Sequence, residues 1–181
     1  ALARAIVIKP SLLLMDEPLG ALDKNLRKEM QAQIKELHKN INVTIIYVTH
    51  DQEEAMYLSD RIVLLDQGKI IQSGTCKELY SSPKNRMVAN FLGECNFIKL
   101  EDGRNITIRP ESFEVLDRKT SENGIEVTVR DLVFLGGYTK LIGSYNQQEI
   151  TATFRSSDLN PNIRKLDKVH LIFNKECLIN L

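Results

Sequence analysis

The stretch Leu12-Leu13-Leu14-Met15-Asp16-Glu17-Pro18 decides the fold of the first part of this 181-residue chain. Its four apolar residues form a short continuous run that ends in two carboxylates and a proline, a pattern typical of a strand buried on both faces. Pro18 cannot donate a backbone hydrogen bond and disfavours a helix before it, so we expect the strand to end there. Asp16 and Glu17 then lie at the carboxyl end of a buried strand, where open α/β sheets bind their ligands.

These two acids have the chemistry that phosphate transfer needs. Mg²⁺ keeps much of its hydration shell and takes one or two carboxylates, so one of the two acids could hold it through a water molecule. The other could orient and polarise an attacking water. An acidic surface turn without a catalytic role explains the same two residues about equally well, so this stretch alone does not decide the function.

A helix and a second strand follow the two acids. Asp23 is a suitable N-cap for a helix that reaches about Lys39. Residues at helical spacing form its apolar stripe: Leu26, Met30, Ile34 and Leu37. The β-branched run at 43–48 predicts another buried strand. Because a strand, a helix and a strand in this order form a parallel crossover, we expect the two strands to be neighbours, with Glu17 and His50 at the same edge.

Shorter elements complete the first part of the chain. Asp51 with Glu54, and Thr75 with Glu78, have the spacing of N-terminal capping pairs. The expected elements are a helix at 51–58, a strand at 61–65, a turn at 66–68, a hairpin arm at 69–72 ended by Gly74, and helices at 75–80 and 86–92 on either side of Pro83.

From Glu94 onward the helical spacing disappears and short β-rich runs begin. The runs that predict strands are 106–108, 113–116, 125–129, 141–142, 150–154 and 169–173, with turns at Asn123-Gly124 and Gly136-Gly137. Short strands at this density predict a small antiparallel barrel.

The composition is that of a globular chain without a charge preference. Hydrophobic residues make up 43%, and 24 basic residues balance 24 acidic ones. Neither half is strongly basic, so nucleic-acid binding has no electrostatic support. No apolar run is long enough to span a bilayer, and the three cysteines have no metal-binding or redox spacing, so we expect a cytosolic setting.

The order of the motifs closely resembles that of the ATP-binding subunit of ABC transporters. Three stretches carry the resemblance: Ala-Leu-Ala-Arg-Ala at 1–5, Asp-Glu-Pro-Leu-Gly-Ala-Leu-Asp at 16–23 and Ile-Ile-Tyr-Val-Thr-His-Asp at 45–51. The first resembles the helix that follows the family's signature motif. The other two resemble the Walker B strand with its D-loop and the switch-histidine region.

The resemblance implies a role for each of four residues. Asp16 matches the Walker B aspartate, which would hold Mg²⁺ through water. Glu17 matches the catalytic glutamate and His50 the switch histidine that contacts the γ-phosphate of ATP. Asp23 lies in the D-loop, where it would touch the partner subunit as well as cap its helix. The implied cofactors are ATP and Mg²⁺.

The resemblance also implies two domains. Residues 1–93 would be the C-terminal portion of an α/β P-loop NTPase of the ABC type, a parallel sheet with helices. Residues 94–181 would form a small all-β, OB-like TOBE domain, because Ile-Arg-Pro-Glu at 108–111 and Leu-Val-Phe-Leu-Gly at 132–136 resemble that domain of importer ATPases. On the residues alone, Arg109 and Glu111 could instead be a plain ion pair, worth little if exposed.

The implied function is ATP hydrolysis coupled to solute import across a membrane. Two such subunits would form a homodimer around two ATP molecules, bound to membrane-spanning permease subunits at the cytoplasmic face. The sequence has neither a Gly-x-x-x-x-Gly-Lys-[Ser/Thr] phosphate loop nor a Leu-Ser-Gly-Gly-Gln signature, so we expect a fragment or truncated product that is inactive alone. Two alternatives stay open: a non-enzymatic regulatory or dimerisation module, and a soluble ABC ATPase not coupled to transport.

Overall fold

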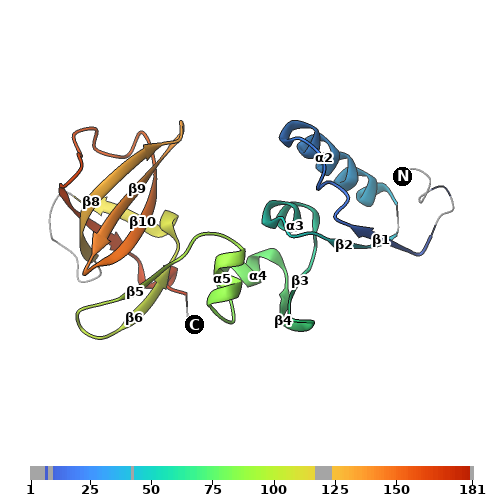
Figure 1. Cartoon of the computed structure of the whole chain (residues 1–181), viewed down its shortest axis with the longest axis horizontal. Helices are drawn as coiled ribbons and strands as arrows, with labels where there is room; N and C mark the ends of the chain where they lie inside the picture. The colour runs from blue at the N-terminus through green and yellow to red at the C-terminus, as the bar shows by residue number, and fades with distance from the viewer. Residues whose placement is uncertain (1–6, 8–9, 42, 117–123, 180–181) are drawn as a thin grey trace. The chain divides into compact units, whose positions relative to one another are not determined.

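The computed structural model describes residues 7, 10–41, 43–116 and 124–179 and divides into two compact units, 1–80 and 81–181 (Figure 1). The first unit contains β1 (Leu12–Asp16), α2 (Lys24–Asn40), β2 (Thr44–Val48), α3 (Gln52–Leu58), β3 (Ile62–Asp66), β4 (Lys69–Gly74) and α4 (Cys76–Ser81). The second contains α5 (Arg86–Phe91), β5 (Asn96–Lys99), β6 (Asn105–Ile108), η1 (Pro110–Ser112), β7 (Phe113–Leu116), β8 (Gly124–Phe134), β9 (Tyr138–Tyr145), β10 (Gln148–Arg155), β11 (Lys168–Phe173) and η2 (Lys175–Cys177). The domain boundary expected after residue 93 stays a prediction, and residues 1–5, which resemble a helix of the family, lie outside the described residues.

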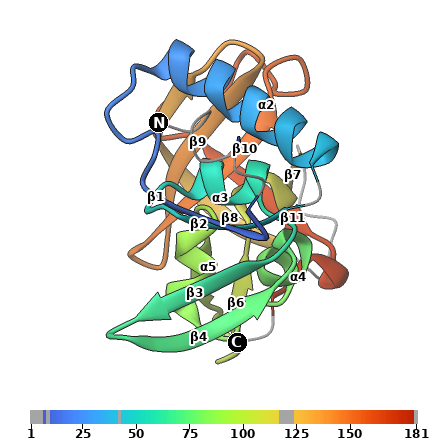
Figure 2. The same ribbon diagram turned by 90° about the vertical axis from the view of Figure 1, so that its right-hand side faces the viewer.

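The parallel pairing of the first two strands is confirmed. Leu12 lies opposite Thr44 and Asp16 opposite Val48, with α2 as the crossover between them. Asp23 caps α2 as expected, because its carboxylate accepts the first free N–H groups of the helix. In the apolar stripe of α2, Ile34 is buried, and Figures 1 and 2 show the helix on one side of the strand pair.

The expectation that these strands are buried on both faces is wrong. Burial alternates along β1: Leu13 and Met15 are buried, whereas Leu14 is 68% exposed. On β2, Ile46 is 50% exposed on that same face. The reason is that α2 covers one side of a two-stranded sheet, and no described element covers the other.

The remaining elements of the first unit agree with the sequence patterns. β3 and β4 form an antiparallel hairpin, and its turn has Gln67 and Gly68 at positive φ, as a tight primed turn requires. Thr75 and Glu78 form the reciprocal capping box: each side chain accepts the other residue's backbone N–H, at 3.2 and 2.8 Å. None of the described helices is long and apolar enough to cross a membrane.

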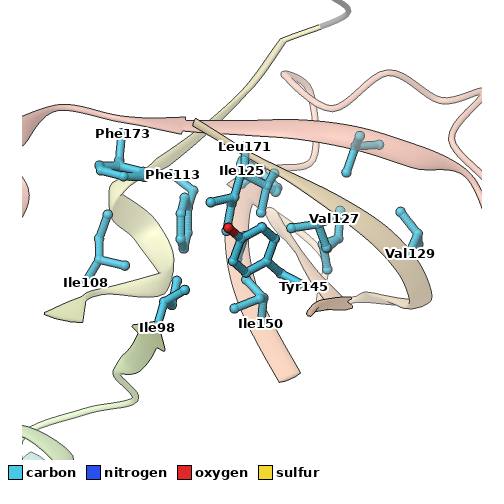
Figure 3. Close-up of a cluster of buried hydrophobic side chains, with 14 of the residues drawn as sticks. Ile98, Ile108, Phe113, Ile125, Val127, Val129, Tyr145, Ile150, Leu171 and Phe173 are labelled. Carbon is cyan, nitrogen blue, oxygen red and sulfur yellow. The ribbon is translucent and has the colours of Figure 1, made fainter. Parts of the chain in front are cut away.

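The second unit is built on a curled antiparallel sheet in the order β10-β9-β8-β11-β7, accompanied by the β5–β6 hairpin. All six predicted strands are present, with β8 and β9 much longer than expected, whereas β5 is not among the predicted strands. Gly124 begins β8 rather than forming a turn, and Asn123 lies outside the described residues. The inward-facing side chains form one apolar core (Figure 3), in which the rings of Phe113 and Phe173 meet edge to face at 6.1 Å. This architecture agrees with an OB-like β domain.

Arg109 connects the strands of the β domain to the segment that precedes them. Its side chain is buried, with 3% exposure, and its Nη1 donates to the carbonyl oxygens of Ala89, Gly93 and Glu94 at 2.8, 2.9 and 3.1 Å. A guanidinium can serve several acceptors because it has five N–H donors in a fixed geometry. Arg109 therefore ties the end of α5 and the segment after it to the β domain.

Candidate functional site

Glu17 leaves the end of β1 in a backbone conformation that is uncommon for its residue type. Its φ is 42°, in the left-handed region, and its N–H donates to the carbonyl of Val48 at 2.9 Å. Its own carbonyl accepts the N–H of Gly20 at 3.2 Å, which closes the turn after the strand. Such a conformation costs roughly 1–2 kcal/mol and persists where neighbouring contacts enforce it, often at functional sites.

Glu17 and His50 meet at the carboxyl edge of the parallel strands, as the sequence predicted. His50 Nδ1 lies 3.0 Å from Glu17 Oε1, and the side chains are 77% and 52% exposed. The hydrogen bond that His50 donates to Glu17, helped by the negative charge of the carboxylate, raises the pKa of His50 above its ordinary value. A histidine held in this way carries a proton or donates a hydrogen bond at neutral pH more readily than a free one.

Asp16 and Asp23 are placed differently from this pair. Asp16 ends β1 with its side chain exposed, whereas the Oδ1 of Asp23 accepts from the backbone N–H groups of Asn25 and Leu26 at 3.0 and 3.1 Å. In the part of the chain that the structure describes, neither aspartate forms an ion pair with His50.

Asp16 fits a hydrated Mg²⁺ better than a metal held by protein ligands alone. No group of three or more His, Cys, Asp or Glu side chains among the described residues is arranged to hold a metal. A single exposed carboxylate at a strand end suits Mg²⁺, which keeps waters and completes its coordination with substrate phosphates.

A buried carboxylate supports the segment that carries His50. Glu54 is 3% exposed, and its Oε2 accepts from the hydroxyls of Tyr47 and Thr49 at 2.8 and 3.0 Å. Burial, followed by the hydrogen bond to Glu54, raises the pKa of Tyr47, so its hydroxyl stays a donor. Asp51 caps α3 as predicted, but Glu54 does not reach back to the N–H of Asp51; the Thr49 hydroxyl accepts that N–H at 3.0 Å.

Arg27 of α2 connects the two halves of this region. Its Nη1 lies 3.4 Å from Asp51 Oδ2, its Nε lies 3.8 Å from Glu54 Oε1, and its Nη2 donates to the Leu22 carbonyl at 3.0 Å. A polar cleft of about 510 Å³ lies beside it, lined by Lys24, Arg27, Lys28, Gln31, His50, Asp51, Gln52 and Glu53. The loop after β1 and the turn after β2 are thus joined through one guanidinium.

The sequence patterns did not reveal these supporting residues. In the sequence, the spacing marks Glu54 only as the second half of a capping pair, and no pattern points to Thr49, Tyr47 or Arg27. The sequence does place Glu54 directly before the small apolar residue Ala55. Both lie on the buried side of α3, where a charged side chain requires partners.

Comparison with known proteins places the chain among ATP-binding proteins of import systems. No family model matches it. It is 49% identical over 145 residues to the spermidine/putrescine import ATP-binding protein PotA of Bacillus thuringiensis subsp. konkukian, an alignment covering 78% of the chain and 43% of the relative. Proteins of the same name from Clostridium novyi and Malacoplasma penetrans are 40% and 39% identical over 173 and 201 residues, covering 82% and 88% of the chain and 49% and 34% of the relatives. The chain thus spans less than half the length of each of these relatives and is homologous, over most of its own length, to the ATP-binding subunits of bacterial ABC importers.

Proposed function

We propose that Glu17, His50 and Asp16 form the hydrolytic edge of an ABC-importer ATPase, in which ATP hydrolysis drives solute uptake. The observation that carries this proposal is the 3.0 Å contact between Glu17 Oε1 and His50 Nδ1 at the ends of two adjacent parallel strands. A carboxylate and an imidazole in contact can act together on a water molecule and on the phosphate that it attacks.

We assign each group the role that its position supports. Glu17 uses one oxygen to hold His50, while its second oxygen, which no described residue hydrogen-bonds, orients the attacking water. His50 donates toward the γ-phosphate, where negative charge develops in the transition state. Asp16 holds Mg²⁺ through water, and that ion, when bound, neutralises charge on the phosphates. Asp23 caps α2 here and contacts a second subunit in the proposed homodimer.

The exposed apolar face of β1 and β2 supports the proposal that these strands belong to a larger sheet. Soluble proteins rarely leave such a face uncovered. Its four members are between 45% and 68% exposed: Leu12, Leu14, Ile46 and Val48. In an ATP-binding protein as long as the relatives, we propose that the rest of a P-loop NTPase sheet and its helices cover this face. Residues 1–181 contain no phosphate loop, so we propose that they do not hydrolyse ATP by themselves.

The remaining features concern the assembly. The β domain agrees with the OB-like accessory domain of importer ATPases, which supports a complex with permease subunits at the cytoplasmic side of a membrane. The names of the relatives favour spermidine and putrescine as the imported solutes.

A chimera tests this function. The matched region of the Bacillus thuringiensis relative is replaced by that of this chain, and ATP hydrolysis by the purified protein is measured. The chimera should hydrolyse ATP, and His50→Ala should lower kcat by about a hundredfold or more. Glu53→Gln, an exposed acid in the same cleft, serves as the control and should hydrolyse normally. Normal turnover in His50→Ala would refute the role of His50.

A further inference from the structure

His50 is an exposed side chain held in a segment whose support is buried. Its imidazole is 77% exposed, yet the residues on both sides of it are fixed by hydrogen bonds that lead to Glu54, which is 3% exposed. An exposed histidine with only local contacts would sample several rotamers. Here the backbone beneath it is anchored from both sides.

The Thr49 hydroxyl makes the bonds that flank His50. It accepts the N–H of Asp51 at 3.0 Å and donates to Glu54 Oε2 at 3.0 Å. The first bond closes a turn around His50, and the second fixes that turn to a buried group. The cap of α3 does not require them, because the Asp51 carboxylate already accepts the N–H groups of Glu53 and Glu54.

Glu54 is itself anchored to two other elements. It accepts the Tyr47 hydroxyl from β2 at 2.8 Å and lies 3.8 Å from the Nε of Arg27 in α2. Because Glu17 follows β1, which pairs with β2, the same framework positions both members of the Glu17–His50 contact. A displacement of the histidine turn would therefore move His50 relative to Glu17.

We propose that Thr49 and Glu54 form a clamp, consisting of one hydroxyl and one buried carboxylate, that positions His50 against Glu17. The inference rests on the proposed hydrolytic function and adds two positioning residues to that site. Neither residue is placed against the nucleotide; both act through His50. Positioning matters because a displacement of about 1 Å can lower a rate by roughly 10²-fold.

NMR titration of the histidines in the 181-residue chain tests the clamp without any nucleotide. The chain has three histidines, so His38 and His170 serve as internal references, and a His50→Gln variant assigns the signal. The charged groups that act on His50 or line the cleft with it are Glu17, Glu53, Glu54, Asp51, Lys24, Arg27 and Lys28. Variants at Thr49 change none of these charges, so a change in the pKa of His50 reports the geometry of its contact with Glu17.

The expected results separate the hydroxyl from its surroundings. Thr49→Val should lower the pKa of His50 toward the value in Glu17→Gln, whereas Thr49→Ser, which keeps the hydroxyl, should leave it as in the original chain. Tyr47→Phe removes the other hydroxyl that donates to the same Glu54 oxygen. Because Tyr47 does not border His50, this change should affect the pKa of His50 less. If Thr49→Val does not fold, Thr49→Ala removes the same hydroxyl without the branched side chain.

Two results would overturn the clamp. The first is an unchanged His50 pKa in the hydroxyl-deficient variants while Glu17→Gln lowers it. The second is an equal decrease in the pKa of His50 in Thr49→Ser and Thr49→Val.

The chimera provides a kinetic test of the same clamp. There, Thr49→Val should lower kcat by roughly tenfold or more with KM for ATP unchanged, whereas Thr49→Ser should keep the original kcat. Because the titration involves no hydrolysis, its failure is distinguishable from a failure of the proposed function.

Discussion

Glu17 and His50 are 33 positions apart in the sequence, and their side chains meet at 3.0 Å because β1 and β2 are adjacent parallel strands with Asp16 opposite Val48. The pairing places the residue that follows β1 beside the turn that follows β2. This contact links the fold to the chemistry, since neither strand alone brings a carboxylate to an imidazole.

The contact predicts a pH-dependent contribution to stability. Glu17 raises the pKa of His50 in the folded state, so the contribution is fully present below the unfolded-state value of about 6.5 and is lost as pH rises through the folded-state value. Glu17→Gln should therefore lower the free energy of unfolding of the first unit, and the decrease should be larger at pH 6 than at pH 9. This decrease is measured by urea unfolding, monitored through the amide signals of β1 and β2. An equal decrease in the free energy of unfolding at both pH values would contradict the contact.

Arg109 should be a major determinant of the stability of the second unit. Arg109→Met leaves carbonyls of Ala89, Gly93 and Glu94 without their buried donor, and should cost about 3 kcal/mol. Arg104→Met is the matched control: that side chain is 58% exposed and pairs with Asp102, so the change should stay within about 0.5 kcal/mol. Urea unfolding monitored by circular dichroism compares them, and equal losses would show that the buried bonds carry no special weight.

Gly143 of β9 should not tolerate a side chain. A Cβ there would lie 2.3 Å from Val127 Cγ1 and 2.9 Å from the Thr128 carbonyl, so Gly143→Ala should destabilise the β domain by about 1–3 kcal/mol. Gly137→Ala has open space around the added methyl group and an ordinary φ, and should be nearly neutral. Thermal unfolding of the two variants checks this. A Gly143→Ala protein as stable as the original would show that β8 and β9 can separate at no cost.

The exposed apolar face should behave differently in the isolated chain and in the chimera. Leu14→Thr with Ile46→Thr should cost less than about 1 kcal/mol in residues 1–181 and reduce self-association, because both side chains are at least half exposed. Leu13→Thr, at a position 7% exposed, should cost about 2–3 kcal/mol. Urea unfolding and sedimentation measure these effects in the isolated chain.

In the chimera the double variant should impair folding, because the rest of the proposed sheet covers that face there. A chimera that folds and hydrolyses ATP normally with both threonines would contradict the proposed covering of the face.

Much of the local structure could be predicted from the sequence because its signals are local. Asp23 caps α2, Thr75 and Glu78 form their box, and Gln67-Gly68 makes its turn, each decided by residues within a few positions. Burial of both faces of β1 could not be predicted correctly, because an apolar run does not reveal what packs on each side. The sequence does not predict β5 because it has only two apolar residues, and its first buried position holds Asn96, whose side chain donates to the Thr151 carbonyl far along the chain.

The site was predictable only in part for a similar reason. The Glu17–His50 contact followed from parallel pairing, which the strand–helix–strand order implied. The support from Arg27, Thr49 and Glu54 depends on side-chain directions between α2, β2 and α3, which no spacing rule describes. Likewise, the position of Arg109 next to a proline in a short strand-like motif gave no sign that its guanidinium reaches back to α5.

The central claim is that Glu17 orients the water that attacks ATP, and one measurement tests it most directly. The chimera and its Glu17→Gln variant are mixed with radiolabelled ATP and Mg²⁺, and bound ATP and released phosphate are followed in the same single-turnover reaction. Since the amide keeps the shape of the side chain but loses its charge, we predict ATP binding within about twofold of the original and hydrolysis slower by about a hundredfold or more. Hydrolysis at the original rate with ATP bound normally would contradict the account.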